Sequence, residues 1–231
     1  MLPGYFTKQE QIAVSGVADV SIRSLLDRNQ FFDPVDEAFD LGISSATWPL
    51  FGLLWPSGAQ LAARIALRPV DANEHILEIG CGLALASIVA HRRGADITAS
   101  DCHPLAAGFL QRNLRLNHLL PMPYVHGQWG VAPVLAECAA QATCAKQYGL
   151  IIGSDVLYER DSKGDLASFI AQHATPAVEV WIVDPDRSNR AAFNKRMAAQ
   201  GFFMREERLD TVASETLAAY KGRLLTYRRD C

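Results

Sequence analysis

From His75 onward, short apolar segments alternate with segments of helical periodicity, and this pattern constrains the fold more than any other feature of the chain. Such alternation is typical of a parallel sheet that is covered by helices on both faces. The pattern predicts five strands, at residues 76–79, 97–100, 123–126, 150–153 and 178–183. It predicts helices at residues 84–93, 104–117, 133–147, 161–173 and 189–200.

The segments on either side of this alternation add a helix and a hairpin. A helix is expected at residues 57–67, with Ser57 as its cap and Pro69 just beyond its end. Residues 202–209 and 223–228 are expected to form an antiparallel hairpin at the edge of the sheet.

Together these elements predict a single α/β domain over residues 1–231. Its sheet is expected to be Rossmann-like, doubly wound, seven-stranded and mostly parallel, with the hairpin at the C-terminal end. Residues 48–231 form the predicted Rossmann-like core, and residues 1–47 form a short N-terminal extension. Partial alternation of apolar and polar residues over residues 18–32 favours one or two short strands in that extension.

Charge and hydropathy argue against two classes of partner. The chain of 231 residues has a net charge of −3, which does not suit a protein that mainly grips a polyanionic backbone. The longest apolar stretch, residues 48–54, is interrupted by Pro49 and Gly52. It is far shorter than the ~20 residues that a membrane-spanning helix needs. We therefore expect neither nucleic acid as the main partner nor a membrane.

Cysteine usage favours a reducing compartment. The cysteines are odd in number, form no C-x-x-C pair and have no histidines at zinc-ligand spacing. The N-terminus shows no basic segment followed by an apolar one, so no signal peptide is expected. A cytoplasmic protein with free thiols and no metal site fits this pattern best. The cysteines are Cys81, Cys102, Cys138, Cys144 and Cys231.

A glycine-containing turn between the first predicted strand and the helix after it is the strongest functional signal. Gly80 and Gly82 allow a tight turn and let a ligand approach the backbone at a helix N-terminus. A dinucleotide-binding turn usually has a third glycine, and Leu85 stands at that position. Glu78 would repel a pyrophosphate but suits a cation such as a sulfonium. A nicotinamide-dependent dehydrogenase therefore remains only a distant alternative.

Asp101 follows the second predicted strand, about 20 residues after the glycines, which is the spacing of an acid that binds the ribose hydroxyls of an adenosine ligand. The alternative is that Asp101 caps the following helix, because Pro104 lies just inside that helix. In combination with the glycine turn, ribose binding is the favoured interpretation.

These residues resemble the seven-β-strand class of S-adenosylmethionine-dependent methyltransferases. The resemblance narrows to the lysine methyltransferase-like family 16, whose members methylate lysines on folded proteins, and it covers roughly residues 48–201. Besides the glycine turn and Asp101, it depends on residues 54–62, on Gln128–Trp129 and on the segment Gly153-Ser154-Asp155-Val156-Leu157-Tyr158. The ordered set is far more specific than any single motif.

The resemblance implies that S-adenosylmethionine is the cofactor. It places Trp55 and Trp129 around the cofactor, although ordinary core burial would also explain either tryptophan. Gln128 stands where the family often has an acid, and its amide could hydrogen-bond the adenine edge. The predicted cofactor-binding residues are Trp55, Glu78, Gly80, Gly82, Asp101, Gln128, Trp129 and Ser154.

Asp155 and Tyr158 are the predicted catalytic residues. They follow the fourth strand at the edge of the sheet where ligands bind, and on an incipient helix they would face the same side. Asp155 would orient an amine and Tyr158 would contact its cationic form through the ring face. The alternative is that Asp155 caps a helix and Tyr158 packs. Residues 184–187 either line the acceptor channel or form an ordinary Asp-Pro turn, and His103 is the one histidine of interest because it lies near Asp101.

Three functions remain open from the sequence. The leading hypothesis is a protein lysine methyltransferase. A methyltransferase that acts on a small amine or heterocycle would need a lid, which the first 45 or so residues would supply. A catalytically silent module that keeps the cofactor fold is the third, and the intact Asp155 and Tyr158 argue against it.

Overall fold

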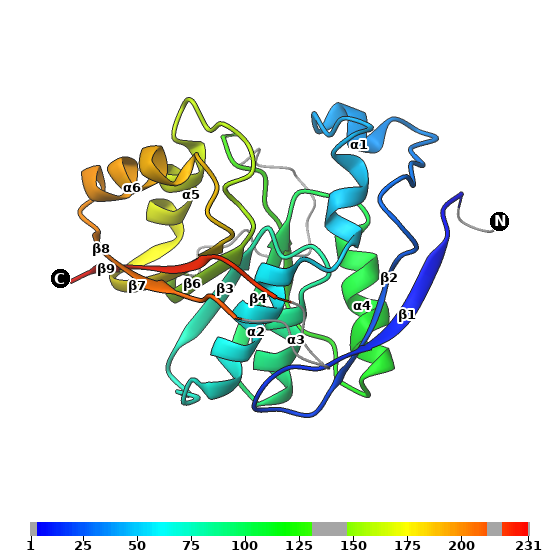
Figure 1. Cartoon of the computed structure of the whole chain (residues 1–231), viewed down its shortest axis with the longest axis horizontal. Helices are drawn as coiled ribbons and strands as arrows, with labels where there is room; N and C mark the ends of the chain where they lie inside the picture. The colour runs from blue at the N-terminus through cyan, green and yellow to red at the C-terminus, as the bar shows by residue number, and fades with distance from the viewer. Residues whose placement is uncertain (1–3, 131–146, 212–218, 231) are drawn as a thin grey trace, which may run out of the picture.

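The computed structural model describes residues 4–130, 147–211 and 219–230, which form a seven-stranded sheet between two layers of helices and a separate two-stranded sheet (Figure 1). The large sheet has the order β5-β4-β3-β6-β7-β9-β8. Its strands are β3 (His75–Ile79), β4 (Asp96–Asp101), β5 (Tyr124–His126), β6 (Tyr148–Ser154), β7 (Ala174–Asp184), β8 (Phe203–Arg208) and β9 (Arg223–Arg229). Its helices are α2 (Pro56–Leu67), α3 (Leu85–Arg92), α4 (Ala106–Leu116), α5 (Asp165–His173) and α6 (Arg190–Ala199).

The strand directions confirm the predicted doubly wound sheet with a C-terminal hairpin. The five strands from β3 to β7 are parallel to one another, and β9 runs antiparallel between β7 and β8. The chain proceeds from β3 to β4 and β5 on one side, then returns to β6 and β7 on the other. This reversal opens a crevice at the carboxyl ends of β3, β4 and β6, the usual position of a ligand in such sheets.

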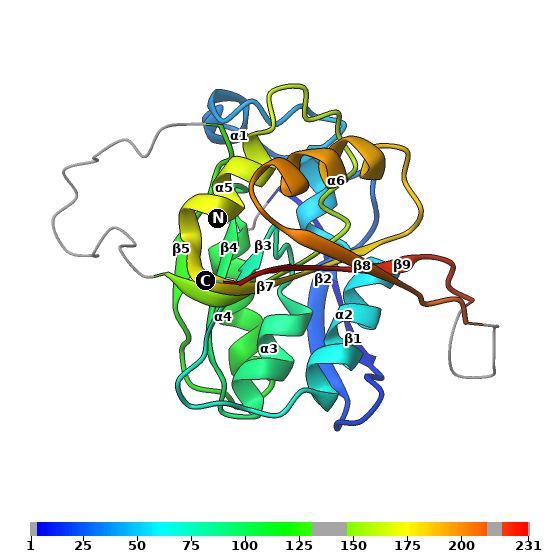
Figure 2. The same cartoon turned by 90° about the vertical axis from the view of Figure 1, so that its left-hand side faces the viewer.

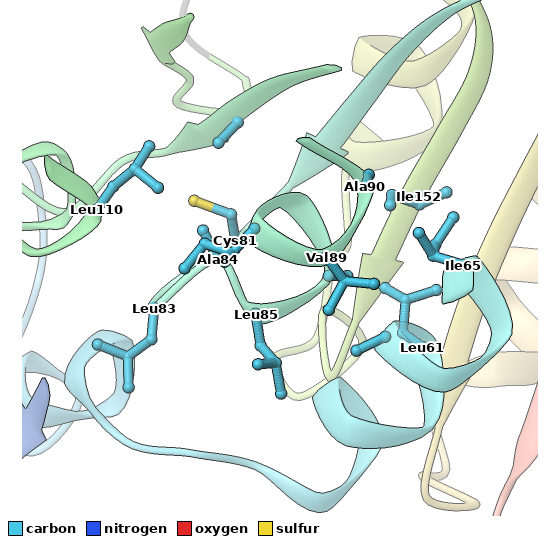
Figure 3. Packing of buried hydrophobic residues seen from close by; sticks show 14 of the residues in the cluster. Leu61, Ile65, Cys81, Leu83, Ala84, Leu85, Val89, Ala90, Leu110 and Ile152 are labelled. Carbon is cyan, nitrogen blue, oxygen red and sulfur yellow. The ribbon is translucent and has the colours of Figure 1, made fainter. Parts of the chain in front are cut away.

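Alternating residues of the central strands supply the two hydrophobic layers, as the pleat of a strand requires. Ile152 faces the layer that contains α2, α3 and α4, whereas Ile151 faces the layer of α5 and α6. Figure 2 shows these two sets of helices on opposite faces of the sheet. In Figure 3, Leu61 and Ile65 of α2 lie beside Val89 of α3 and Ile152. This packing fixes the strand ends that carry the site.

The N-terminal extension forms an antiparallel sheet of β1 (Thr7–Ile12) and β2 (Val20–Leu25). The sequence pattern predicted β2 but not β1, because residues 7–12 are almost entirely polar and exposed. Apolar side chains of β2, including Ile22 and Leu25, are fully buried against the main core.

Two asparagines, Asn113 within α4 and Asn117 at its C-cap, hold the outer edge of β2. Asn117 accepts a hydrogen bond from the Ser21 N–H (2.9 Å) and donates one to the Ser21 carbonyl (2.8 Å). Asn113 makes the same pair of bonds with Arg23, at 2.8 and 3.3 Å. Four residues of a helix and two residues of a strand both advance by about 6 to 7 Å, so the two amides match successive outward-facing backbone groups. They replace a third strand at this edge.

Several sequence-based boundaries need correction. Ser57 does not cap α2, because Trp55 is the N-cap residue, Pro56 is the first helical residue and the Ser57 hydroxyl instead lies 3.0 Å from the Tyr220 hydroxyl. α5 begins at Asp165 rather than at Asp161, whose carboxylate binds backbone N–H groups ahead of the helix. The predicted helix 133–147 falls almost wholly outside the described residues.

Two short helical elements, α1 (Glu37–Asp40) and the 3₁₀ helix η1 (Trp48–Gly52), link the extension to α2. The predicted α6 is present at nearly the expected position, and its Phe193 and Met197 are buried. Among the described helices, none is long and apolar enough to cross a membrane.

Candidate active site

A cavity of about 700 Å³ lies at the carboxyl ends of β3, β4 and β6. One wall comes from residues 41–43 of the N-terminal extension, and another comes from residues 154–163 after β6. The structure brings all ten residues that the sequence singled out to this one cavity. They are Trp55, Glu78, Gly80, Gly82, Asp101, Gln128, Trp129, Ser154, Asp155 and Tyr158.

The turn after β3 needs both of its glycines. Gly80 and Gly82 have φ angles of +56° and +52°, a region that side chains other than glycine rarely adopt. A Cβ at Gly80 would come within 2.9 Å of Val156 Cγ1, and one at Gly82 would come within 2.8 Å of the Phe51 carbonyl oxygen. Leu85, at the position of a third glycine, is the first residue of α3 and is buried. The turn therefore offers bare backbone to the cavity.

Asp101 is held in place by the backbone around it. Its Oδ2 accepts a hydrogen bond from the Gly82 N–H (2.8 Å), and its Oδ1 accepts one from the His103 N–H (2.8 Å). Burial raises the pKa of the carboxyl, while these backbone donors act against the increase. Asp101 does not cap α4, whose N-cap residue is Leu105. The carboxylate is thus fixed at the cavity wall beside the glycine turn.

Glu78 is more deeply engaged than the sequence indicated. Its side chain is only 3% exposed, and its Oε2 accepts hydrogen bonds from the N–H (2.8 Å) and the hydroxyl of Ser87 in α3. Burial raises the pKa of Glu78 to about 7, and the nearby Asp101 charge adds to the increase. One carboxylate oxygen therefore secures α3, and near neutral pH the group is poised between its neutral and charged forms. A cation in the cavity would favour the charged form.

Three of the predicted cofactor-binding side chains line the cavity with defined contacts. Gln128 donates a hydrogen bond to the Leu41 carbonyl (2.9 Å), so the N-terminal extension fixes its orientation. Trp55 donates from its indole N–H to the Leu50 carbonyl (2.9 Å) and remains 37% exposed. The ring of Trp129 lies against Gly80, 3.7 Å from the position of an added Cβ. Neither tryptophan is an ordinary fully buried core residue.

Asp155 forms an ion pair that the sequence did not reveal. Its Oδ1 lies 2.7 Å from Nη1 of Arg187, which comes from the loop after β7. Burial raises the pKa of Asp155, and the charge of Arg187, with a smaller effect of Ser57, opposes this. The predicted incipient helix is wrong: Asp155 has φ of +59° and the segment to Tyr158 is a turn. Both side chains nevertheless line the same cavity.

The second oxygen of Asp155 is unused by the protein. Asp155 Oδ2 is buried and has no hydrogen-bond partner within the ranges that the structure describes. The side chain of Tyr158 is 48% exposed. Desolvation of its hydroxyl group raises the pKa of the phenol, so the phenol is neutral at physiological pH. An available carboxylate oxygen and an exposed aromatic ring in the same cavity are suitable contacts for an amine.

The sequence left open whether residues 184–187 line the cavity or form an ordinary turn, and the structure shows both roles within this loop after β7. Arg187 lines the cavity, and Asp184 supports it by accepting its backbone N–H (2.7 Å). Asp186 instead lies 2.7 to 2.8 Å from Arg190, Arg208 and Arg223 and has a structural role. These ion pairs lower its pKa to about 2.

His103 is a buried wall residue rather than a proton donor. Its ring stacks on Phe51 with centroids 3.6 Å apart, and its Nδ1 accepts the Leu105 N–H (3.2 Å). Burial lowers the pKa of His103 to about 3, so the ring is neutral. No group of three or more potential metal ligands occurs in the described part of the chain.

Comparison with known proteins agrees with this geometry. A family model described as lysine methyltransferase matches residues 52–203. Curated relatives include electron transfer flavoprotein beta subunit lysine methyltransferases of zebrafish (Danio rerio; 37% identity over 33% of this chain and 31% of the relative) and mouse (Mus musculus; 27%, 80% and 69%). A third is the histone-arginine methyltransferase METTL23 of Xenopus laevis (27% identity over 58% of this chain and 57% of the relative).

The chain thus spans between about a third and two thirds of the length of these relatives. A solved methyltransferase of Pyrococcus furiosus shares the fold, with a TM-score of 0.57 and 15% identity over 76% of this chain and 83% of the other. The cavity fits the family's cofactor, since its lining includes a bare backbone turn, a carboxylate fixed beside that turn and two tryptophans. The chain belongs to the lysine methyltransferase family, and its cofactor is S-adenosylmethionine.

Proposed function

We propose that this protein transfers a methyl group from S-adenosylmethionine to the side-chain amine of a lysine on a protein acceptor. The family match and the lysine-specific relatives support this proposal. The observation that carries it is Asp155: one carboxylate oxygen is neutralised by Arg187, and the other is buried, unpartnered among the described residues and adjacent to the cofactor turn.

At the cofactor end of the cavity, different residues would bind the ribose, the amino-acid part and the adenine of the cofactor. Asp101 would receive the ribose hydroxyls, as an acceptor already fixed by two backbone donors. The turn at Gly80 and Gly82 would lie against the amino-acid part of the cofactor, with Glu78 behind it as the group that responds to positive charge. Trp129 and Gln128 would border the adenine, and Ser154 also lines the cavity.

The acceptor end has to align an amine and exclude water. When bound, S-adenosylmethionine supplies an electrophilic methyl group on a sulfonium sulfur. Asp155 Oδ2 would accept a hydrogen bond from the amine and direct the nitrogen lone pair along the line of the breaking carbon–sulfur bond. Tyr158 would wall the slot. The lysine ammonium would lose a proton to water, which leaves a neutral amine as the nucleophile. The new nitrogen–carbon bond would replace the carbon–sulfur bond, and sulfur would keep the bonding electrons.

The exposure of the acceptor end favours a protein over a small molecule. The N-terminal extension lines one wall through residues 41–43, yet Trp55 and Tyr158 remain 37% and 48% exposed. A lid that enclosed a small amine would cover both rings.

The test is transfer of labelled methyl groups. Purified protein with radiolabelled S-adenosylmethionine and a lysate from its own source should label a protein band, and mass spectrometry should place the label on lysine. Bound S-adenosylhomocysteine without any labelled component would instead support a catalytically silent module.

An arginine acceptor is the second candidate. Relatives named histone-arginine methyltransferases support it, at 26 to 28% identity over 55 to 58% of this chain. The same labelled band decides between the two, because mass spectrometry separates methyl-lysine from methyl-arginine.

We also propose a cytoplasmic location, without nucleic acid or membrane as the main partner. The described cysteines, Cys81 and Cys102, are free thiols, as a reducing compartment requires. Fractionation of source cells with an antibody to the protein would test the location.

A further inference from the structure

One segment beside the cavity exposes an unusual combination of side chains. We call residues 26–40 the rim segment. It contains five acidic residues and one basic residue, a net charge of −4, whereas the whole chain carries −3. The rest of the chain is therefore at +1, and the negative charge of the protein is concentrated here. The acidic residues are Asp27, Asp33, Asp36, Glu37 and Asp40.

The rim segment also exposes large apolar side chains. Phe31, Val35 and Phe39 are 52%, 74% and 72% exposed. Exposed apolar residues are normal when they are scattered, but here they lie within nine residues of sequence and alternate with carboxylates. Asp36, Glu37 and Asp40 make no ion pair with any residue that the structure describes. The exposed side chains of Val35 and Phe39 and the carboxylates of Asp36, Glu37 and Asp40 are therefore available to a partner.

The fold nevertheless holds this segment in a defined shape. Asp33 accepts hydrogen bonds from the N–H groups of Ala38 (3.1 Å) and Phe39 (2.9 Å). Ala38 is fully buried, and its carbonyl accepts the Ile43 N–H (2.9 Å). Asp33 and Ala38 thus anchor a short turn of helix that directs Val35 and Phe39 outward.

The rim segment is continuous with one wall of the cavity. Leu41, Gly42 and Ile43 follow it directly and line the cavity, and Gln128 binds the Leu41 carbonyl. Figures 1 and 2 show α1 on the same side of the molecule as the loop that leads to α5, which carries the opposite wall. A protein that inserts a lysine between these walls would pass over the rim segment.

We infer that the rim segment is the docking surface for the acceptor protein, and that it selects a lysine flanked by basic residues together with a large apolar residue. This inference rests on the proposed function and names its substrate class. Carboxylates without partners attract cationic flanks, and the exposed aromatic rings offer area for the apolar residue. An anionic nucleic acid or membrane surface is disfavoured by the same charge.

Two short fluorescent peptides test the inference. Each has one lysine between leucines, flanked in one peptide by arginines and in the other by glutamates, and binding is measured in the presence of S-adenosylhomocysteine. We expect the arginine peptide to bind at least about tenfold more tightly at low salt, with the preference falling as salt rises. The variant Asp36→Asn/Glu37→Gln/Asp40→Asn should lose most of that preference. The variant Val35→Ser/Phe39→Ser should weaken both peptides.

A matched control separates a local effect from net charge. Asp19→Asn/Asp71→Asn/Asp230→Asn changes the net charge by the same amount at exposed positions that do not line the cavity. It should bind both peptides as the unmodified protein does. Binding of S-adenosylhomocysteine and the melting temperature should stay unchanged in the rim variants, because their side chains are exposed and outside the cofactor site.

Failure of this inference is distinguishable from failure of the proposed function. If lysine methylation of the lysate band occurs but the rim variants match the unmodified protein in peptide binding and in methyl transfer, the docking surface is elsewhere. If Val35→Ser/Phe39→Ser converts a dimer into a monomer in sedimentation velocity, the rim segment binds a second copy, which also overturns the inference. Peptide preference without any methyl transfer would leave docking intact and reject the proposed function.

Discussion

The two ends of the cavity are built in opposite ways. At the cofactor end, Glu78 and Asp101 are buried, and backbone or hydroxyl donors of the protein hold both carboxyl groups. At the acceptor end, Asp155 has an unpartnered oxygen among the described residues, and Tyr158 and the rim segment face solvent. Carboxyl groups that are already hydrogen-bonded within the protein form a rigid binding site for one fixed ligand. A buried carboxylate oxygen without a hydrogen bond is available to a ligand group. The contrast indicates an invariant cofactor and a selected acceptor.

The largest effect should come from filling the glycine turn. Gly82→Ala places a Cβ 2.8 Å from the Phe51 carbonyl oxygen and imposes a positive φ on alanine. We expect S-adenosylhomocysteine affinity to fall by more than about a hundredfold, because the strained backbone shifts by more than the ligand contacts tolerate. Gly94→Ala is the control, since its φ of +86° is also positive but nothing lies within 4 Å of the added Cβ. An equal loss of S-adenosylhomocysteine affinity in both variants would show that backbone strain alone, rather than the fit of the glycine turn to the ligand, is responsible.

Asp155→Asn should affect the acceptor end and spare the cofactor end. The amide keeps the shape, but it loses the ion pair with Arg187 and the charge beside the amine. Methyl transfer should fall by about ten- to a hundredfold, and S-adenosylhomocysteine affinity should change by less than about twofold. Single-turnover kinetics and calorimetry on the same preparation measure both. A variant with normal turnover would remove Asp155 from the mechanism.

Glu78→Gln should change how stability depends on pH. The pKa of Glu78 in the folded protein is raised to about 7, so between about pH 4.5 and pH 7 the folded state binds more protons than the unfolded state. The free energy of unfolding should therefore be highest below this window and fall as pH rises through it, by up to roughly 3 kcal/mol. Urea unfolding at acid and alkaline pH should show that glutamine removes this decrease. A variant with the same pH slope would contradict the assignment.

The smallest effect should be local to the N-terminal sheet. Asn113→Leu leaves the Arg23 N–H and carbonyl without their partners, at a cost of about 1–3 kcal/mol. Hydrogen exchange at the Arg23 amide should accelerate while the amides of β3 and β6 stay protected. Gln11→Ala is the control, because the Gln11 side chain donates an exposed hydrogen bond to the Ser21 hydroxyl (2.8 Å) and supports no backbone group of β2 among the described residues. Uniform acceleration across the chain would mean that β2 is part of the main cooperative unit.

The sequence predicted the cofactor end well because its determinants are local. The strand, the turn at Gly80 and Gly82, the buried start of α3 and Asp101 lie within about 25 residues and follow the pattern of a parallel sheet. The helix and strand positions in the core were also predicted, since one apolar face of each element is buried.

The acceptor end was predicted less well because its contacts join distant segments. Asp155 pairs with Arg187 from another strand end, and Ser57 faces Tyr220 across 163 residues of sequence. Periodicity carries no information about such pairs. The polar strand β1 was missed for a related reason: it is stabilised by pairing with β2 rather than by a buried face of its own. Arg187 had one available signal, its place in a loop at the carboxyl end of a strand.

Calorimetric titration of S-adenosylhomocysteine into the unmodified protein and into Asp101→Ala tests the central assignment most directly. Asp101→Ala removes the acceptor of two backbone bonds and the proposed ribose contact. The unmodified protein should bind in the micromolar range and should not bind NAD, and the variant should bind at least about tenfold more weakly, as the loss of charged hydrogen bonds implies. Unchanged affinity in Asp101→Ala, or preference for NAD, would contradict the account.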